Sequence, residues 1–167
     1  MYKIGDTVLY GHVGVCKITE IVSRKIKDVE HHYYSLSPLD QKLTVLVPID
    51  SITSKKMQPI LSKEMIYELI KAMPNNETIW INDKNVRKQK YHQIINSGDH
   101  QQLVKLIKTL YLNKQEQIKN GKKQHVQDQV TLETAEKILY DEFSVTLDIK
   151  RDQVLPFILN TIKINEK

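Results

Sequence analysis

Residues 3–15 read KIGDTVLYGHVGV and combine a short run of strand-forming residues with three closely spaced glycines. Residues 7–10 (TVLY) favour an extended strand, because β-branched and aromatic side chains pack well on a pleated surface. Gly11 and Gly14 flank the next segment and permit the tight turn that ends a strand. The stretch therefore predicts β structure at the start of the chain.

The pattern of short strands separated by turns continues to about Thr53. Further strands are predicted at residues 15–22, 32–36 and 43–47, with a hairpin turn at Lys27 and Asp28. Closely spaced strands of this composition favour a small antiparallel barrel. A Gly-Asp entry to a strand, followed by a glycine-flanked turn, recurs in SH3-like and Tudor-like barrels. We therefore expect a Tudor/SH3-like β-barrel over residues 1–56.

After Ser51 and Ile52 the pattern becomes helical. Ser62 is typical of a helix N-cap, and Pro74 ends the helix. Its apolar stripe is expected to comprise Met65, Ile66, Leu69, Ile70 and Met73. A second helix is predicted over residues 84–97, with Tyr91, Ile94 and Ile95 facing inward.

Three further helices are expected. Gly98 suits the left-handed end of the second helix, and Asp99 caps the third. A fourth starts at about Asp128, and a last one covers about residues 152–163, where Pro156 is tolerable only in the first turn. Short connections favour an antiparallel all-α helical bundle over residues 57–167. The predicted fold class is α+β, with the strands and helices segregated.

Charge is unevenly distributed along the chain. The net charge is +5, and residues 57–124 contain 12 Lys and Arg against 6 Asp and Glu, whereas residues 125–167 contain 5 against 8. A basic middle segment favours a polyanionic partner such as nucleic acid.

Cysteine usage and hydropathy indicate where the protein works. The single cysteine, Cys16, excludes an internal disulfide and favours a reducing compartment. No apolar run reaches the roughly 18–20 residues of a membrane span. We expect a cytoplasmic monomer without a membrane partner.

The only tryptophan, Trp80, lies among turn-forming residues just before a basic run. The basic residues of this run are Lys84, Arg87, Lys88 and Lys90. A single tryptophan is often a core residue. An aromatic ring beside cations is also what a protein needs to press on a base step while neutralising phosphates. A loop residue is less often a core residue than a helix residue is, so the position of Trp80 in a predicted loop leaves both interpretations open.

The sequence contains no recognisable catalytic or metal-binding motif. There is no phosphate-binding glycine loop, no nucleophile elbow and no His-Glu-x-x-His. His31 and His32 are adjacent on a predicted strand, so their side chains point to opposite faces and do not chelate one ion together. We expect a protein that is not an enzyme and that has no cofactor and no metal.

Four features together resemble the CarD/CdnL family of bacterial transcription regulators. They are the opening segment, the strand LTVLVP at residues 43–48, the lone Trp80 ahead of a basic helix, and Ser97-Gly98-Asp99 before the next helix. The resemblance implies an N-terminal domain that binds the RNA polymerase β subunit, as the related domain of transcription-repair coupling factor does. It also implies a helical domain that contacts promoter DNA at the upstream edge of the bubble and stabilises the open complex.

The resemblance also implies roles for individual residues. Trp80 corresponds to the tryptophan that wedges into the minor groove, and Arg24 to the arginine after the first hairpin strand. An exposed-edge strand that includes Val45, Leu46 and Val47 is expected to meet polymerase. Some relatives carry a basic residue where this chain has Leu46, so a more apolar polymerase contact is expected. Charge and proximity alone select Lys84, Arg87, Lys88 and Lys90 as DNA contacts.

Two other functions are compatible with the residues. An RNA- or ribosome-associated protein with a KOW-like barrel would bind structured RNA without polymerase. A protein–protein adaptor would keep Trp80 in its core and leave the basic helix solvated. Co-purification with polymerase separates the three functions.

Overall fold

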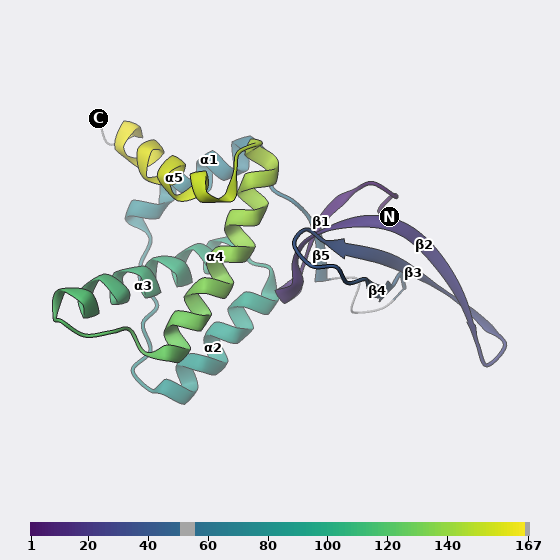
Figure 1. Ribbon diagram of the computed structural model, residues 1–167, viewed down its shortest axis with the longest axis horizontal. Helices are drawn as coiled ribbons and strands as arrows, with labels where there is room; N and C mark the ends of the chain where they lie inside the picture. Colours follow the sequence, from purple (N-terminus) through teal and green to yellow (C-terminus); the bar gives the residue numbers. More distant parts are fainter. Residues whose placement is uncertain (51–55, 166–167) are drawn as a thin grey trace. The chain divides into compact units, whose positions relative to one another are not determined.

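The computed structural model describes residues 1–50 and 56–165, and the end of the predicted β segment at Thr53 lies outside them. The chain divides into two compact units, Met1–Ile60 and Leu61–Lys167. The first unit is a β-sheet and the second is helical (Figure 1). The predicted α+β class, with segregated strands and helices, is confirmed.

The described residues of the first unit form one five-stranded antiparallel sheet. Its strands pair in the order β4-β3-β2-β1-β5. They span Thr7–Tyr10 (β1), Gly14–Ile26 (β2), Val29–Pro38 (β3), Val45–Pro48 (β4) and Met57–Pro59 (β5). Consecutive strands β1 to β4 are neighbours, and the last strand returns to pair with the first, as expected for an SH3-like arrangement.

The hairpin between β2 and β3 is longer than the sequence pattern indicated. Its turn lies at Lys27 and Asp28, as predicted, and both residues have positive φ (48° and 66°). Two such residues form the type I′ turn that matches the twist of the flanking strands. Pairing runs without interruption from Ile26 and Val29 back toward the sheet, and the hairpin extends past the other strands (Figure 1).

The core of the sheet lies on one face of these strands. Its fully or nearly fully buried side chains are Val8, Cys16, Ile18, Tyr34, Leu36, Val47 and Met57. A register shift between Ile18 and Glu20 marks a bulge in β2, and a bulge bends a strand and increases its twist. This bend lets one strand contribute to a small core at one end and to the hairpin at the other.

The prediction that strands stop before residue 53 is wrong, because β5 follows at Met57–Pro59. Met57 pairs with Tyr10, and Pro59 with Val8, at the edge of the sheet. Proline is tolerated there because an edge strand needs fewer donors. Three residues are too few to show an alternating pattern, so sequence periodicity missed the strand.

Residues 61–165 of the second unit form five α-helices. They span Lys63–Ala72 (α1), Lys84–Ser97 (α2), His100–Lys119 (α3), Val126–Leu147 (α4) and Arg151–Asn165 (α5). A short 3-10 helix, Met73–Asn75 (η3), follows α1. α4 packs against each of the other α-helices, and its inward residues include Leu139 and Phe143.

The predicted helix ends are confirmed by their cap contacts. The Ser62 hydroxyl accepts a hydrogen bond from the Met65 N–H at 3.3 Å. Gly98 ends α2 in the left-handed region (φ 73°), and the Asp99 carboxylate accepts from the Gln102 N–H at 3.1 Å. Gly98 and Asp99 thus separate α2 from α3 with the shortest connection in the described part of the bundle.

Two details of the helices differ from the predictions. Met65 is 55% exposed, because the buried side of α1 is centred on Ile66 and Ile70. Pro156 lies inside α5, past its first turn, because the helix begins at Arg151. The apolar neighbours Val154 and Ile158 are buried on either side of the proline, so packing holds the helix through it.

Candidate functional site

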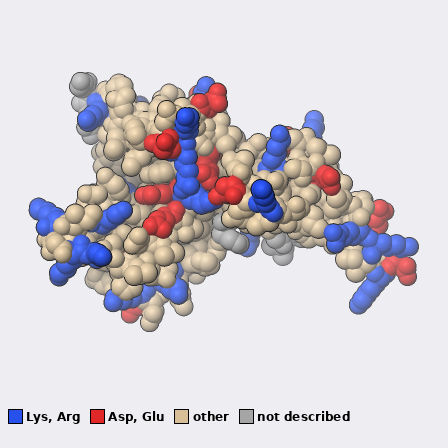
Figure 2. Space-filling view, in the orientation of Figure 1, with Lys and Arg blue, Asp and Glu red and all other residues tan. Residues whose placement is uncertain are grey.

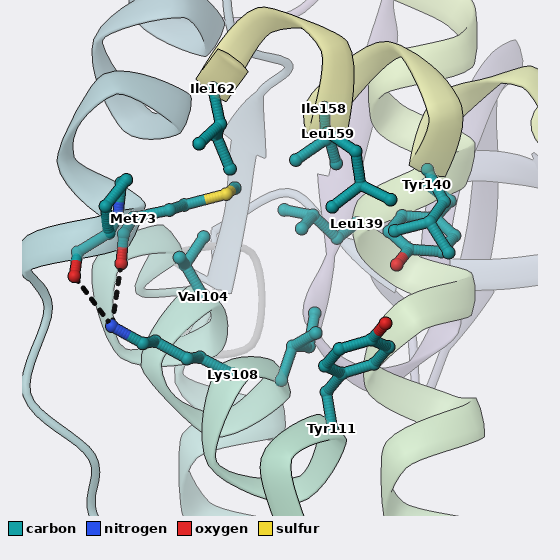
Figure 3. Close-up of a pocket in the computed structure, with 12 residues that line it drawn as sticks. Met73, Val104, Lys108, Tyr111, Leu139, Tyr140, Ile158, Leu159 and Ile162 are labelled. Carbon is teal, nitrogen blue, oxygen red and sulfur yellow. Dashed lines mark hydrogen bonds between the residues drawn. The ribbon is translucent and has the colours of Figure 1, made fainter. Parts of the chain in front are cut away.

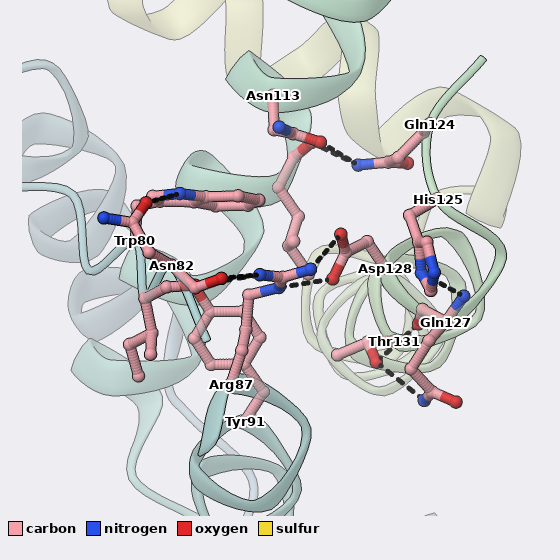
Figure 4. Close-up of polar contacts among 12 residues, drawn as sticks. Trp80, Asn82, Arg87, Tyr91, Asn113, Gln124, His125, Gln127, Asp128 and Thr131 are labelled. Carbon is pink, nitrogen blue, oxygen red and sulfur yellow. Dashed lines mark hydrogen bonds and ion pairs between the residues drawn. The ribbon is translucent and has the colours of Figure 1, made fainter. Parts of the chain in front are cut away.

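Trp80 lies in the segment between η3 and α2, and its side chain is not in the core. The residue is 41% exposed. Its indole Nε1–H donates a hydrogen bond to Asn82 Oδ1 at 3.0 Å (Figure 4). The expectation of an exposed tryptophan is confirmed, and the core position that the adaptor function requires is excluded.

Arg87, on the first turn of α2, lies against one face of the indole. Its Cζ atom is 4.4 Å from the centroid of the Trp80 ring. An arginine over an indole at this distance is a cation–π pair. Arg87 therefore covers one face of a ring that is partly exposed.

Asp128 and two backbone carbonyls fix the Arg87 guanidinium. Arg87 Nε donates to Asp128 Oδ1 at 2.9 Å, and Nη2 donates to Asp128 Oδ2 at 3.0 Å. Nη1 donates to the carbonyl oxygens of Ile81 (2.8 Å) and Asn82 (3.3 Å). The paired fork of arginine and carboxylate is a geometrically specific contact, and both residues are about 95% buried.

This position corrects the role that charge alone gave to Arg87. Its charge is neutralised by Asp128 and its side chain is only 5% exposed, so the guanidinium is not presented to a phosphate. Arg87 therefore contacts one face of the Trp80 indole and holds it in place.

The segment that leads to Trp80 is held by side chains from α2 and α3. The Tyr91 hydroxyl donates to the Ile79 carbonyl at 2.9 Å, and the Ile79 N–H donates to Thr109 Oγ1 at 3.0 Å. Burial raises the pKa of Tyr91 and outweighs the opposite effect of the nearby Arg87 charge. Both polar groups of one backbone residue, directly before Trp80, are therefore bonded to helices.

Lys108 fixes the start of the same segment. Its Nζ donates to the carbonyl oxygens of Met73 (3.0 Å), Pro74 (3.1 Å) and Asn76 (2.7 Å). Its stem lines an apolar cavity of about 230 Å³ between η3, α3, α4 and α5 (Figure 3). The charged group of Lys108 thus bonds to backbone carbonyl oxygens of the same helical unit.

The remaining predicted cations lie on two sides of α2. Lys84, Lys88 and Lys90 are all exposed. Lys84 and Lys88 are one helical turn apart and share a flank, whereas Lys90, two residues further, is rotated by roughly 160° from Lys88. Lys84 and Lys88 thus form one local pair, and Lys90 faces another direction.

A second basic group follows α3. It consists of Lys119, Lys122 and Lys123, all exposed, at the end of α3 and in its connection to α4. Figure 2 shows Lys and Arg side chains gathered over this end of α3. The group offers a second cationic surface on the helical unit.

In the first unit, β4 is an edge strand, as its predicted role requires. The Ile49 N–H donates to the His32 carbonyl at 3.0 Å. Because alternate residues of an antiparallel strand bond to the same neighbour, Val47 and Val45 direct their polar backbone groups toward β3. The N–H and C=O of Leu46 point the other way, toward the outer side of the strand.

The side chains of β4 have different environments. Val47 is only 1% exposed and belongs to the sheet core, and Val45 packs against that core. The Leu46 side chain alternates to the opposite face and is partly exposed. Arg24 is exposed on the hairpin, opposite His31.

Candidate metal-binding clusters and helices able to cross a membrane are both absent from the described residues. They contain no group of three or more His, Cys, Asp and Glu side chains arranged to hold a metal ion. Among the helices of the same residues, none has the length and apolar character needed to cross a membrane.

Comparison with known protein families covers both units. Residues 2–61 match the CarD-like/TRCF RID domain, and residues 66–158 match the CarD C-terminal domain. The chain belongs to the CarD family. Its domains indicate a transcription-associated regulator that interacts with RNA polymerase.

A curated relative supports this assignment along the whole chain. The "Putative transcription factor YdeB" of Bacillus subtilis (strain 168) is 21% identical over 157 residues, which cover 94% of this chain and 99% of that protein. The CarD family is a group of transcription factors that are generally non-enzymatic.

Sequence reasoning missed two of the residues around Trp80 in this CarD protein. Asp128 is 41 positions away from Arg87, and no local pattern links an acidic residue at a helix start to an arginine so distant. Asn82 is one of the turn-forming residues around Trp80, and the sequence pattern does not show that its side-chain oxygen accepts the indole N–H two residues before it.

Proposed function

We propose that this CarD protein binds the RNA polymerase β subunit through its first unit and promoter DNA through Trp80, and thereby stabilises the open complex. The observation that carries the proposal is the exposed indole of Trp80, which is stacked on Arg87 and has Lys84 and Lys88 on the helix that follows. The proposed DNA position is the minor groove at the upstream edge of the bubble.

The proposed polymerase contact uses the outer side of β4 and the Arg24 side chain. An edge strand with outward-directed backbone groups can add to a sheet in a partner. Leu46 supplies the outward N–H and C=O, and its side chain adds an apolar contact. Val45 and Val47 contribute by holding the strand on the core.

In the proposed mechanism, polymerase melts the DNA and the protein opposes reannealing. A ring inserted at a base step must offset an unstacking cost of a few kcal/mol. This cost is smaller where polymerase has already opened the step. Binding to polymerase raises the local concentration of the Trp80 region at the promoter. A moderate net charge of +5 is therefore sufficient.

The decisive experiment measures open-complex lifetime with the full chain and its Trp80→Ala variant. Base–aromatic stacking contributes about 1–3 kcal/mol, so the variant should shorten the added lifetime by roughly five- to 150-fold. It should still bind polymerase. Because Trp80 is partly exposed, the variant should lose no more than about 1 kcal/mol of folding stability.

Two results would contradict the proposal. Normal open-complex lifetimes with a folded Trp80→Ala variant would contradict the proposed role of Trp80 as a wedge. Failure of the parent protein to co-purify with polymerase, together with binding to structured RNA, would favour the KOW-like alternative.

A further inference from the structure

The indole of Trp80 is held by two contacts before any DNA is present, and a third residue orients one of the contacting side chains. Arg87 covers one face of the ring at 4.4 Å. Asn82 Oδ1 accepts the indole N–H at 3.0 Å, which fixes the rotation of the ring within its plane. Asp128 orients the Arg87 guanidinium through two hydrogen bonds of 2.9 and 3.0 Å.

These contacts are unusual for a residue on a turn-rich segment. An exposed tryptophan without partners would sample several rotamers, and binding would have to restrict them at a cost in affinity. Here a buried ion pair from two helices, α2 and α4, supports an exposed ring (Figure 4). The Arg87 guanidinium is buried, so it does not present its charge to solvent. Its contact with the Trp80 ring accounts for its position.

We propose that Arg87, Asp128 and Asn82 are positioning residues that preorganise the Trp80 indole in one orientation, with a single face open for stacking. This inference rests on the proposed function for its effect on DNA. The order of the ring itself is a property of the free protein, so the two can be tested separately.

Trp80 is the only tryptophan of the chain, so the intrinsic fluorescence of the full-length protein reports on this ring alone. Two variants, called the seat variants, remove different contacts that hold the indole. Asn82→Ala changes an exposed residue and leaves the buried ion pair intact. The double variant Arg87→Gln/Asp128→Asn removes both members of the pair, so neither charge is left buried without a partner and the net charge is unchanged. Lys88→Gln, an exposed change on the same helix, is the control.

The first measurement is time-resolved fluorescence anisotropy and acrylamide quenching of the free proteins. We expect faster local motion of the indole in both seat variants. Quenching of the double variant should roughly double, because the covered face of the ring becomes accessible. The control should match the parent. If both seat variants are folded by circular dichroism and their indole is as ordered as in the parent, preorganisation is refuted.

The second measurement uses DNA and polymerase. The double variant should shorten the open-complex lifetime by about two- to fivefold, the factor expected for a cation–π contact at a partly exposed site. Its salt dependence of DNA binding should equal that of the parent, whereas Lys88→Gln should reduce the log–log slope by about one.

The combinations of outcomes separate the two proposals. A loosened indole with unchanged open-complex lifetime, alongside a short lifetime for Trp80→Ala, overturns the positioning role and leaves the wedge in place. An unchanged lifetime for Trp80→Ala itself overturns the proposed function. A changed salt slope in the double variant would show that Arg87 meets phosphate directly, which contradicts a positioning role.

Discussion

The backbone N–H of Leu61 donates a hydrogen bond to Glu142 Oε1 at 2.8 Å, across 81 positions of the chain. The second carboxylate oxygen of Glu142 lies 2.6 Å from His100 Nε2, within hydrogen-bond distance. The Thr146 hydroxyl donates to the Leu61 carbonyl at 2.8 Å. The first residue of the helical unit is thus tied at both polar groups to α4.

Replacing this carboxylate should destabilise the helical unit. Glu142 is fully buried, so Glu142→Leu leaves the Leu61 N–H without its acceptor and the His100 ring without its partner. We expect a loss of about 3–5 kcal/mol in the free energy of unfolding, measured by urea denaturation. Glu133→Gln, an exposed change on the same helix, is the control and should stay within about 0.5 kcal/mol of the parent. Equal stabilities of the two variants would contradict the contact's importance.

The buried Tyr91 hydroxyl should make the helical unit sensitive to alkaline pH. Burial raises the pKa of Tyr91 above its usual 10.0, so the folded state favours the protonated phenol. The resulting stabilisation is complete below pH 10 and is lost as pH rises through the higher folded pKa. Tyr91→Phe should therefore flatten this alkaline decline while costing about 1 kcal/mol at neutral pH through the lost bond to Ile79.

The measurement is the free energy of unfolding against pH, with tyrosinate absorbance recorded on the same samples. Tyr67→Phe changes an exposed ring and serves as the control. Tyr140 also has a pKa raised by burial, so part of the decline should persist in Tyr91→Phe. An identical decline in parent and Tyr91→Phe would show that the Tyr91 hydroxyl is not the titrating group.

Salt dependence should identify which lysines meet DNA phosphates. Lys84 and Lys88 share a flank of α2, whereas Arg87 is paired and Lys90 faces elsewhere. Two phosphate contacts predict a log–log slope of roughly −2 for DNA binding by the free protein. Lys84→Gln/Lys88→Gln should bring the slope near zero, and Lys90→Gln should leave it unchanged. A slope that persists in the double variant would transfer the phosphate contacts to Lys119, Lys122 and Lys123.

A proline at position 46 tests strand addition at β4. Leu46→Pro removes an N–H that points away from β3 and keeps the inward bonds of Val45 and Val47, so the sheet should remain folded. Leu46→Thr keeps the N–H and replaces the apolar side chain. If the backbone makes the polymerase contact, the proline variant should lose binding in a pull-down and the threonine variant should retain most of it. The reverse order would mean that the side chain carries the contact.

Local signals in the sequence were sufficient for much of the fold. Ser62, Gly98 and Asp99 act within a few residues of themselves, so the ends of α1, α2 and α3 could be read directly. The type I′ turn at Lys27 and Asp28 is equally local. The exposure of Trp80 followed from its polar surroundings.

Features that depend on distant partners could not be read from the sequence. β5 has only three residues, and its pairing with β1 defines it. The role of Arg87 was misjudged because its charge is local information, whereas the Asp128 that neutralises it comes from another helix. The sequence shows that a residue is positively charged, but only the tertiary structure shows whether its charged group faces solvent.

Both outer strands of the sheet are very short, and each ends in a proline, Pro48 in β4 and Pro59 in β5. A proline cannot donate to an added strand, so pairing at either edge can extend over only a few residues. A further molecule that adds a strand at either edge can therefore form only a few backbone hydrogen bonds. This prevents the sheet from growing into a fibre from either edge. The same brevity keeps a strand-addition complex reversible, because few backbone bonds must break when the protein leaves.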